Sequence, residues 1–135
     1  MKFLNLIKTA GLSSVAFFAF TVAAPAQAPD LALLDGLQKG SWTLKERGAS
    51  DSSKRICLGD AKLLLQVQHG SAKCTRYVIE DKPNVLRVSY KCGNLGHGVT
   101  EIRRESSGLI QLNSQGISSG SPFSFSAEGR RTGAC

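Results

Sequence analysis

Four cysteines are the residues of this 135-residue chain with the most definite chemistry: Cys57, Cys74, Cys92 and Cys135. Successive members of this set are 17, 18 and 43 residues apart. A structural zinc site draws its ligands from close pairs such as C-x-x-C, so these spacings disfavour metal binding and dithiol redox catalysis. An even number of cysteines in a small chain instead predicts two disulfides, as in proteins of oxidising compartments.

The two histidines, His69 and His97, are the other candidates for catalysis. A general base needs a partner that positions it, and nothing close to either histidine in the sequence supplies one. His97 lies in a glycine-rich segment, 93–98, which lacks the Lys-Ser/Thr pair and the following helix of a phosphate-binding loop. A turn that needs positive φ angles explains these glycines. With no G-x-S-x-G elbow either, we expect a protein that is not an enzyme and binds no cofactor.

Charge is more informative than any motif. The chain has 17 Lys and Arg residues against 10 Asp and Glu residues, a formal net charge of +7. This balance favours anionic partners through long-range attraction. Nucleic acid is disfavoured because no aromatic side chains are interleaved with the basic ones. We therefore expect an anionic envelope component, such as a lipid, or another exported protein as the partner.

One candidate binding site involves Arg87, Glu101 and Arg104. In a strand over 99–105, charged side chains would lie on both faces. Whichever face turned toward the core would therefore bring a charged side chain with it, and charges are rarely buried without a partner. The favoured interpretation is an edge or strongly twisted strand whose charges prevent edge-to-edge aggregation. The other is a polar cavity on the concave side of a sheet, where Arg87 and Arg104 hold an anionic head group.

A second candidate is the pair Arg130 and Arg131, since Cys135 would restrain a tail that otherwise frays. Here too a structural role is favoured. One arginine would face solvent, and the other would pack its stem over the sheet or donate to carbonyls near the chain end.

The N-terminal residues indicate export. Lys2 and Lys8 are followed by an apolar run over 10–24 and by the A-x-A site Ala26-Gln27-Ala28. The run is shorter than the ~20 residues that cross a bilayer. We expect residues 1–28 to be a signal peptide, removed to give a mature chain that begins at Pro29, has no transmembrane segment and is periplasmic or secreted. Without Lys2 and Lys8 the net charge is +5.

Residues 29–135 are expected to form one domain, mainly β with one short helix (α+β). Turn signals recur between short alternating runs, which predicts an antiparallel meander of about seven strands, curved into a half-barrel. The expected strands are 41–47, 54–57, 74–80, 85–92, 99–106, 109–116 and 123–131. Asp60 is a good N-cap for a two-turn helix over 61–68, and a helical turn is expected within 31–37.

The expected core is the alternating apolar set that would close one face of the sheet over the helix: Trp42, Leu44, Leu63, Leu64, Val67, Tyr77, Ile79, Leu86, Val88, Tyr90, Ile110, Leu112, Phe123 and Phe125.

The meander also suggests how the cysteines pair. Cys74 and Cys92 are almost equidistant from the turn at 81–84, so they fall at the same end of one hairpin. The pairing Cys74–Cys92 then leaves Cys57–Cys135. The alternative pairing Cys57–Cys74 is still allowed by the sequence, because a one-residue slip in strand register would move Cys74 to the other face of the sheet.

Several motifs resemble a family of exported proteobacterial proteins, the domain of unknown function numbered thirty-six-seventeen. They are Gly40-Ser-Trp42-Thr-Leu44, Cys57-Leu58, Cys92-Gly93 and the closing Gly129-Arg130-Arg131-Thr-Gly133-Ala-Cys135. The resemblance spans nearly all of the mature chain and implies an exported, cysteine-paired β domain, with no established catalytic residues. The sequence thus favours an exported, non-catalytic binding protein, with a small periplasmic enzyme or enzyme inhibitor as the alternative.

Overall fold

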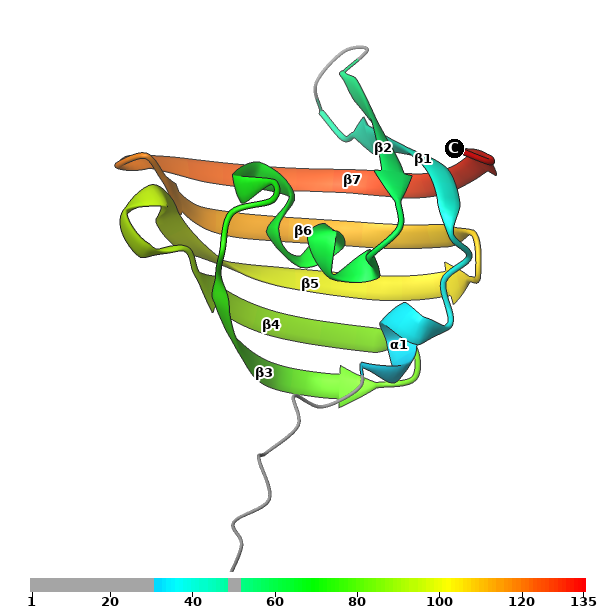
Figure 1. The fold of residues 1–135 in the computed structure, drawn as a ribbon, viewed down its shortest axis with the longest axis horizontal. Coiled ribbons are helices and arrows are strands. Elements are labelled where there is room, and N and C mark those ends of the chain that lie inside the picture. The colour runs from blue at the N-terminus through cyan, green and yellow to red at the C-terminus, as the bar shows by residue number, and fades with distance from the viewer. Residues whose placement is uncertain (1–30, 49–51) are drawn as a thin grey trace, which may run out of the picture.

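The computed structural model describes residues 31–48 and 52–135 (Figure 1). The expected signal peptide and the start of the mature chain at Pro29 lie outside these residues. Within the described ranges, no helix is both long and apolar enough to cross a membrane.

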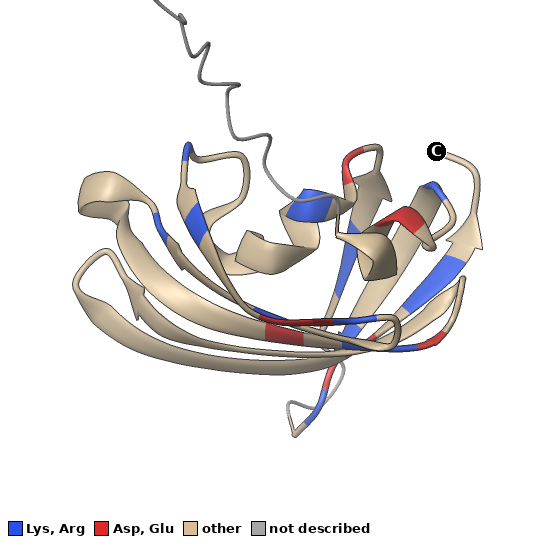
Figure 2. Cartoon of the chain, turned by 90° about the horizontal axis from the view of Figure 1, so that it is seen from below, with Lys and Arg blue, Asp and Glu red and all other residues tan. Residues whose placement is uncertain are grey.

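Seven antiparallel strands form one open sheet in the order β2-β1-β7-β6-β5-β4-β3. The strands are β1 (Gly40–Glu46), β2 (Ser53–Leu58), β3 (Thr75–Lys82), β4 (Val85–Lys91), β5 (Gly96–Ser106), β6 (Leu109–Ser118) and β7 (Ser121–Gly133). Neighbouring strands follow one another in the chain except where β1 pairs with β7. The sheet is strongly curved, as Figure 2 shows, and the predicted open meander of seven strands is confirmed.

The helical segments α1 (Ala32–Asp35) and η1 (Ala61–His69) lie inside the curve of the sheet (Figures 1 and 2). The two-turn helix expected over 61–68 corresponds to η1, which is a 3-10 helix with a break at Gln66. Gln66 leaves the helical conformation, and its buried Nε2 donates hydrogen bonds to the carbonyls of Gly70 and Ala72, at 2.8 and 2.7 Å. The break thus satisfies a polar side chain that would otherwise be buried without partners.

Most of the expected core is buried between the sheet and these helices. The predicted residues that are buried are Trp42, Leu44, Leu64, Val67, Leu86, Val88, Tyr90, Ile110 and Leu112. The prediction missed a second group, Leu31, Leu33, Leu34, Leu37, Leu58, Leu65, Ile102 and Ala127. Half of these come from α1 and the residues around it, so α1 contributes more to the core than its length suggests.

Three expected core residues are exposed: Leu63 (36% exposed), Tyr77 (71%) and Ile79 (49%). Tyr77 is opposite Ser89, on the outer side of the sheet. The register then shifts between Val78 and Glu80, so a β-bulge at Ile79 interrupts the alternation. Val78 packs against the core in their place.

Both disulfides have the expected pairing. Cys74–Cys92 closes the open end of the β3–β4 hairpin, and Cys57–Cys135 joins β2 to the residues after β7. Since these two bonds use all four cysteines, the alternative pairing Cys57–Cys74 is excluded.

Candidate functional site

The concave face of the sheet is filled, whereas the convex face is open. α1, η1 and the leucine-rich core occupy the concave side. No helix of the described residues covers the convex side (Figure 2). Any ligand that meets the sheet itself therefore meets its convex face.

The first pair of candidate arginines is divided between the two faces. Arg87 of β4 is exposed on the convex face, directly opposite Glu101 of β5. Arg104 is opposite the buried Ile110, and its guanidinium lies against Gly36, where an added Cβ would clash with Nη1. The structure brings Arg87 and Glu101 together but separates both from Arg104, so they do not line one concave cavity.

β5 itself differs from the favoured expectation. It lies between β4 and β6, so it is not an edge strand. Its inward positions include Thr100 and Ile102, both fully buried, while Glu101 and Arg103 face outward. His97 is part of this strand, opposite Ile117, and not a loop residue as its glycine neighbours suggested.

The second pair of candidate arginines has structural contacts. Arg131 donates from Nε to the carbonyl of Lys39 at 2.8 Å. Arg130 is exposed and forms an ion pair with Glu128 at 3.0 Å. That arginine holds the pKa of the Glu128 carboxyl below its ordinary value, mainly through their hydrogen bond. The two neighbours therefore point to opposite faces, as alternation in a strand requires.

A straight row of side chains crosses the convex face over five strands. Its members are successive register partners from β3 to β7: Tyr77, Ser89, Val99, Gln115 and Ser124. Adjacent strands are ~4.8 Å apart, so this row is about 19 Å long. We call it the middle row.

Two further rows flank the middle row. On one side are Glu80, Arg87, Glu101, Asn113 and Ser126, and on the other are Thr75, Lys91, His97, Ile117 and Pro122. Ser89 and Val99, which are register partners at the centre of the middle row, are shorter than the residues beside them in both flanking rows. The convex face therefore has a shallow groove that is deepest at Ser89 and Val99.

Three hollows follow this groove and meet at Val99. Their volumes are about 280, 490 and 460 Å³, and Val99 lines all three. One extends toward Arg87 and Asn113, the second toward Tyr77 and Lys91, and the third toward Ile117. We call the combined feature the convex groove.

Hydrogen-bonding groups dominate the hollow beside Arg87 and Asn113, whereas the other two hollows are mainly apolar. Ser126 donates to Asn113 Oδ1 at 2.8 Å, which leaves the amide hydrogens of Asn113 free. Arg87 and Lys91 form no ion pair with another residue of the described chain. Glu80 does form one, with Lys82, and the Lys82 ammonium holds the pKa of that carboxyl below its ordinary value. The groove thus offers amides, hydroxyls, two cations, the Glu101 carboxylate and one exposed aromatic ring.

Sequence reasoning found Arg87 and Glu101 but missed Ser89, Val99, Gln115 and Ser124. Single serine and glutamine residues on strands carry no compositional signal. Their alignment depends on the register of four successive strand pairs, which only the folded sheet specifies.

Among residues 31–48 and 52–135, no group of three or more His, Cys, Asp or Glu side chains is arranged to hold a metal ion. Comparison of the chain with family models, with curated proteins and with solved structures finds no match. The resemblance to the family of unknown function therefore stays a prediction. The two disulfides are those of a protein from an oxidising compartment.

Proposed function

We propose that the protein is an exported, non-catalytic binding protein whose convex groove holds an extended acidic glycan of the cell envelope. The observation that carries this proposal is the alignment of the middle row across five strands, with hollows that meet at Val99. A groove about 19 Å long suits several consecutive units of a linear polymer.

The side chains of the groove favour a sugar polymer. Sugar hydroxyls both donate and accept hydrogen bonds, as do the amides of Asn113 and Gln115 and the hydroxyls of Ser89 and Ser124. Tyr77 is the exposed aromatic at one end, and its apolar ring with a polar tip suits the apolar face of a sugar. Arg87 supplies a charged hydrogen-bond donor for a carboxylate or phosphate on the chain.

Other partners fit the groove less well. Acyl chains would meet charged side chains on both flanks of the groove, at Arg87 and Glu101 on one side and Lys91 on the other. An extended peptide gains affinity by adding a strand to a sheet edge, but β4 to β7 are internal and their backbone groups already pair with neighbours. Within the anionic envelope components expected from the charge, an acidic glycan is therefore the best fit.

The proposal can be tested by calorimetry with the oxidised protein and an oligogalacturonate, with a neutral oligosaccharide and anionic phospholipid vesicles as separate arms. The informative variant is Val99→Lys, which places a long side chain at the point where the hollows meet. Val85→Lys is the matched control, since Val85 is also a half-buried valine on the convex face but lines none of the three hollows. Both variants add the same charge.

We expect the acidic oligosaccharide to bind, more weakly at high salt because exposed charges are screened. Val99→Lys should weaken binding at least about tenfold, or ~1.4 kcal/mol, while Val85→Lys stays close to the parent protein. Equal losses in the two variants would contradict the proposed site. Binding to the vesicles but not to the oligosaccharide would show that the partner is a lipid surface and not a glycan.

A further inference from the structure

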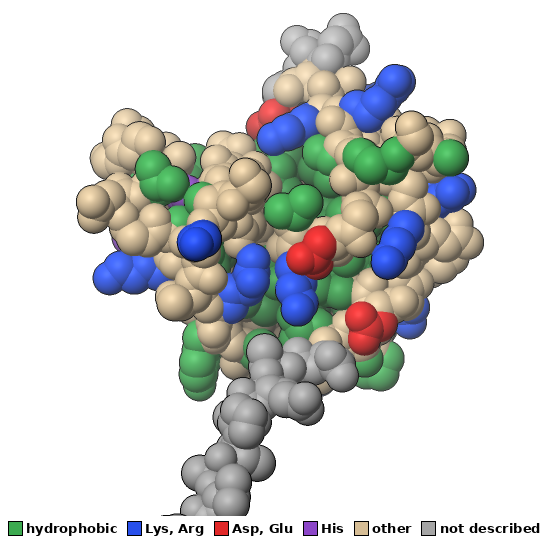
Figure 3. Space-filling model, in the orientation of Figure 1, with side chains coloured by type: hydrophobic (Ala, Val, Ile, Leu, Met, Phe, Trp, Pro, Cys, Tyr) green, Lys and Arg blue, Asp and Glu red, His purple; other side chains and the backbone are tan. Residues whose placement is uncertain are grey.

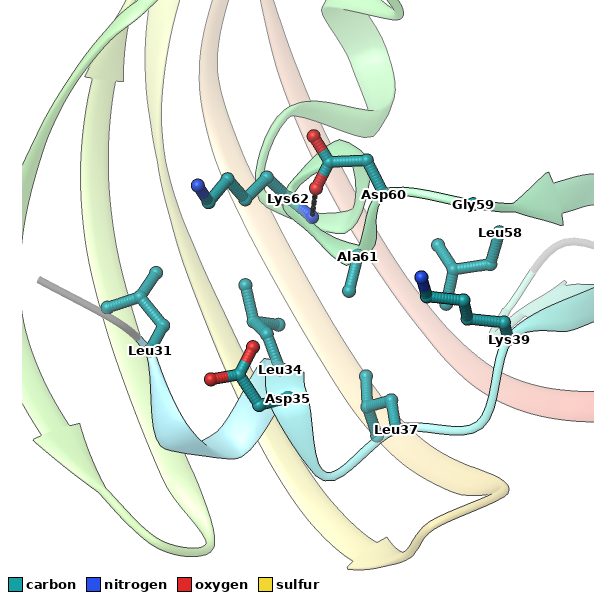
Figure 4. A pocket seen from close by; sticks show the side chains of 10 residues that line it. All are labelled: Leu31, Leu34, Asp35, Leu37, Lys39, Leu58, Gly59, Asp60, Ala61 and Lys62. Atoms are coloured by element: carbon teal, nitrogen blue, oxygen red, sulfur yellow. Dashed lines mark hydrogen bonds between the residues drawn. The ribbon is translucent and has the colours of Figure 1, made fainter. Parts of the chain in front are cut away.

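A separate hollow lies on the other side of the sheet, between α1, the end of β2 and the start of η1 (Figure 4). Its volume is about 390 Å³. Leu31, Leu34 and Leu37 line it from α1 and its flanks, and Leu58 and Ala61 line it from the opposite wall. The hollow therefore has an apolar floor that is continuous with the core.

Four charged side chains, two of each sign, surround this floor: Asp35, Lys39, Asp60 and Lys62. All four are exposed, and none forms an ion pair with any other described residue. One oxygen of Asp60 accepts a hydrogen bond from the backbone N–H of Lys62 at 2.9 Å, which leaves its other oxygen available. In the space-filling view, hydrophobic surface between the helical segments is bordered by groups of both charges (Figure 3).

We propose that this hollow binds a small zwitterion with apolar side chains, an apolar dipeptide. A ligand carboxylate would pair with Lys62, and a ligand ammonium would pair with Asp35. The apolar side chains would lie on the leucine floor, where burial of apolar surface is favourable.

Charge and size both restrict the occupant. The rim has two charges of each sign, so a ligand of one sign is repelled by one pair as it is attracted by the other, whereas a molecule with both charges can pair with both signs. Ligand pockets have volumes of roughly 300–1,000 Å³, and this hollow lies near the lower end of that range. A dipeptide fits this limit, whereas a folded partner or a long acyl chain does not.

This inference is independent of the proposed glycan site, which lies on the opposite face of the sheet. No residue lines both the hollow and the convex groove. Each proposal can fail without affecting the other.

The test is calorimetric titration of the oxidised protein with leucyl-leucine, and it uses three comparison ligands. N-acetyl-leucyl-leucine amide keeps the apolar side chains but lacks both charges. Glycyl-glycine keeps the charges but lacks the side chains, and free leucine tests the size of the ligand. We expect leucyl-leucine to bind most tightly and both the blocked dipeptide and glycyl-glycine to bind at least about tenfold more weakly.

The matched variants are Asp35→Asn/Lys62→Gln at the rim and Asp81→Asn/Lys45→Gln elsewhere on the surface. All four positions are exposed, and each double variant removes one charge of each sign. The rim variant should weaken leucyl-leucine binding at least about tenfold, and the control should leave it unchanged. Absence of binding by the parent protein, equal binding of the blocked dipeptide, or an unaffected rim variant would each overturn the proposal. Tighter binding of free leucine would also overturn the choice of a dipeptide.

Discussion

The two disulfides should stabilise the domain unequally, because they close loops of very different length. The sequence separation is 78 residues for Cys57–Cys135 and 18 residues for Cys74–Cys92. In the chain-entropy model, a cross-link stabilises the fold by restricting the unfolded chain, and the effect grows with the logarithm of loop length. That model gives about 4.5 kcal/mol for the longer loop and about 3.2 kcal/mol for the shorter one.

Two single-disulfide variants separate this effect from side-chain packing. Cys74→Ala/Cys92→Ala keeps only the long loop, and Cys57→Ala/Cys135→Ala keeps only the short one. The free energy of unfolding of each variant is measured in urea before and after reduction. The difference between the two values is the contribution of the one disulfide that the variant keeps. This design matters because Cys92 is buried whereas Cys57 and Cys135 are exposed.

Trp42 provides the signal for this experiment, since it is the only tryptophan in the chain and is fully buried. Reduction should lower the free energy of unfolding by about 1.3 kcal/mol more in the variant that keeps Cys57–Cys135. An equal loss in the two variants, or a larger loss for the short loop, would show that native-state contacts and not loop entropy determine the contribution of each bond.

Three further predictions concern stability. Thr100→Val should lower the free energy of unfolding by ~1–3 kcal/mol in urea denaturation, because the buried Thr100 hydroxyl is hydrogen-bonded to the Leu65 carbonyl and to the Ser114 hydroxyl, each at 2.8 Å, and the variant removes both bonds. Arg131→Ala should lower the melting temperature more than Arg130→Ala, since only Arg131 holds a backbone carbonyl of a distant segment, and an equal effect in calorimetry would contradict this role. Burial raises the pKa of Tyr90, so this side chain ionises at a lower pH in the unfolded chain than in the folded one. The stability that Tyr90 contributes should be full below about pH 10, and the free energy of unfolding should fall above that pH. Urea denaturation at a series of pH values should show a smaller fall in the Tyr90→Phe variant.

The strands and the disulfide pairing could be predicted because they depend on local signals. Alternation along segments such as 85–92 and turn residues at 81–84 specify a hairpin without reference to the rest of the chain. The nearly equal distances of Cys74 and Cys92 from that turn then place the two sulfurs together. Errors appeared where a tertiary contact overrides the pattern, as at the bulge at Ile79 and the break at Gln66.

The candidate sites could be predicted only in part, because a site on a sheet depends on which strands are adjacent and in which register. The sequence indicated that Arg87 and Glu101 are unusual but not that they share the convex face. It also could not place Arg104 against Gly36, which is distant in the chain. The small residues of the middle row are ordinary in isolation and become a groove only through the registers of four strand pairs.

The single non-sequential strand pair, β1 with β7, affects how the chain folds. The strands from β3 to β7 can form by successive hairpins, each of which closes only a short loop, whereas β1 must wait for the last strand of the sheet. Until then β1 and β2 are an isolated two-stranded hairpin, which is marginal in water. Trp42 and Leu44 have no sheet to cover them during this interval, so a chain that emerges from its N-terminus presents these two apolar side chains early and buries them late. Docking of this hairpin is therefore the expected slow step, and the half-folded intermediate is the species most exposed to aggregation and to chaperones.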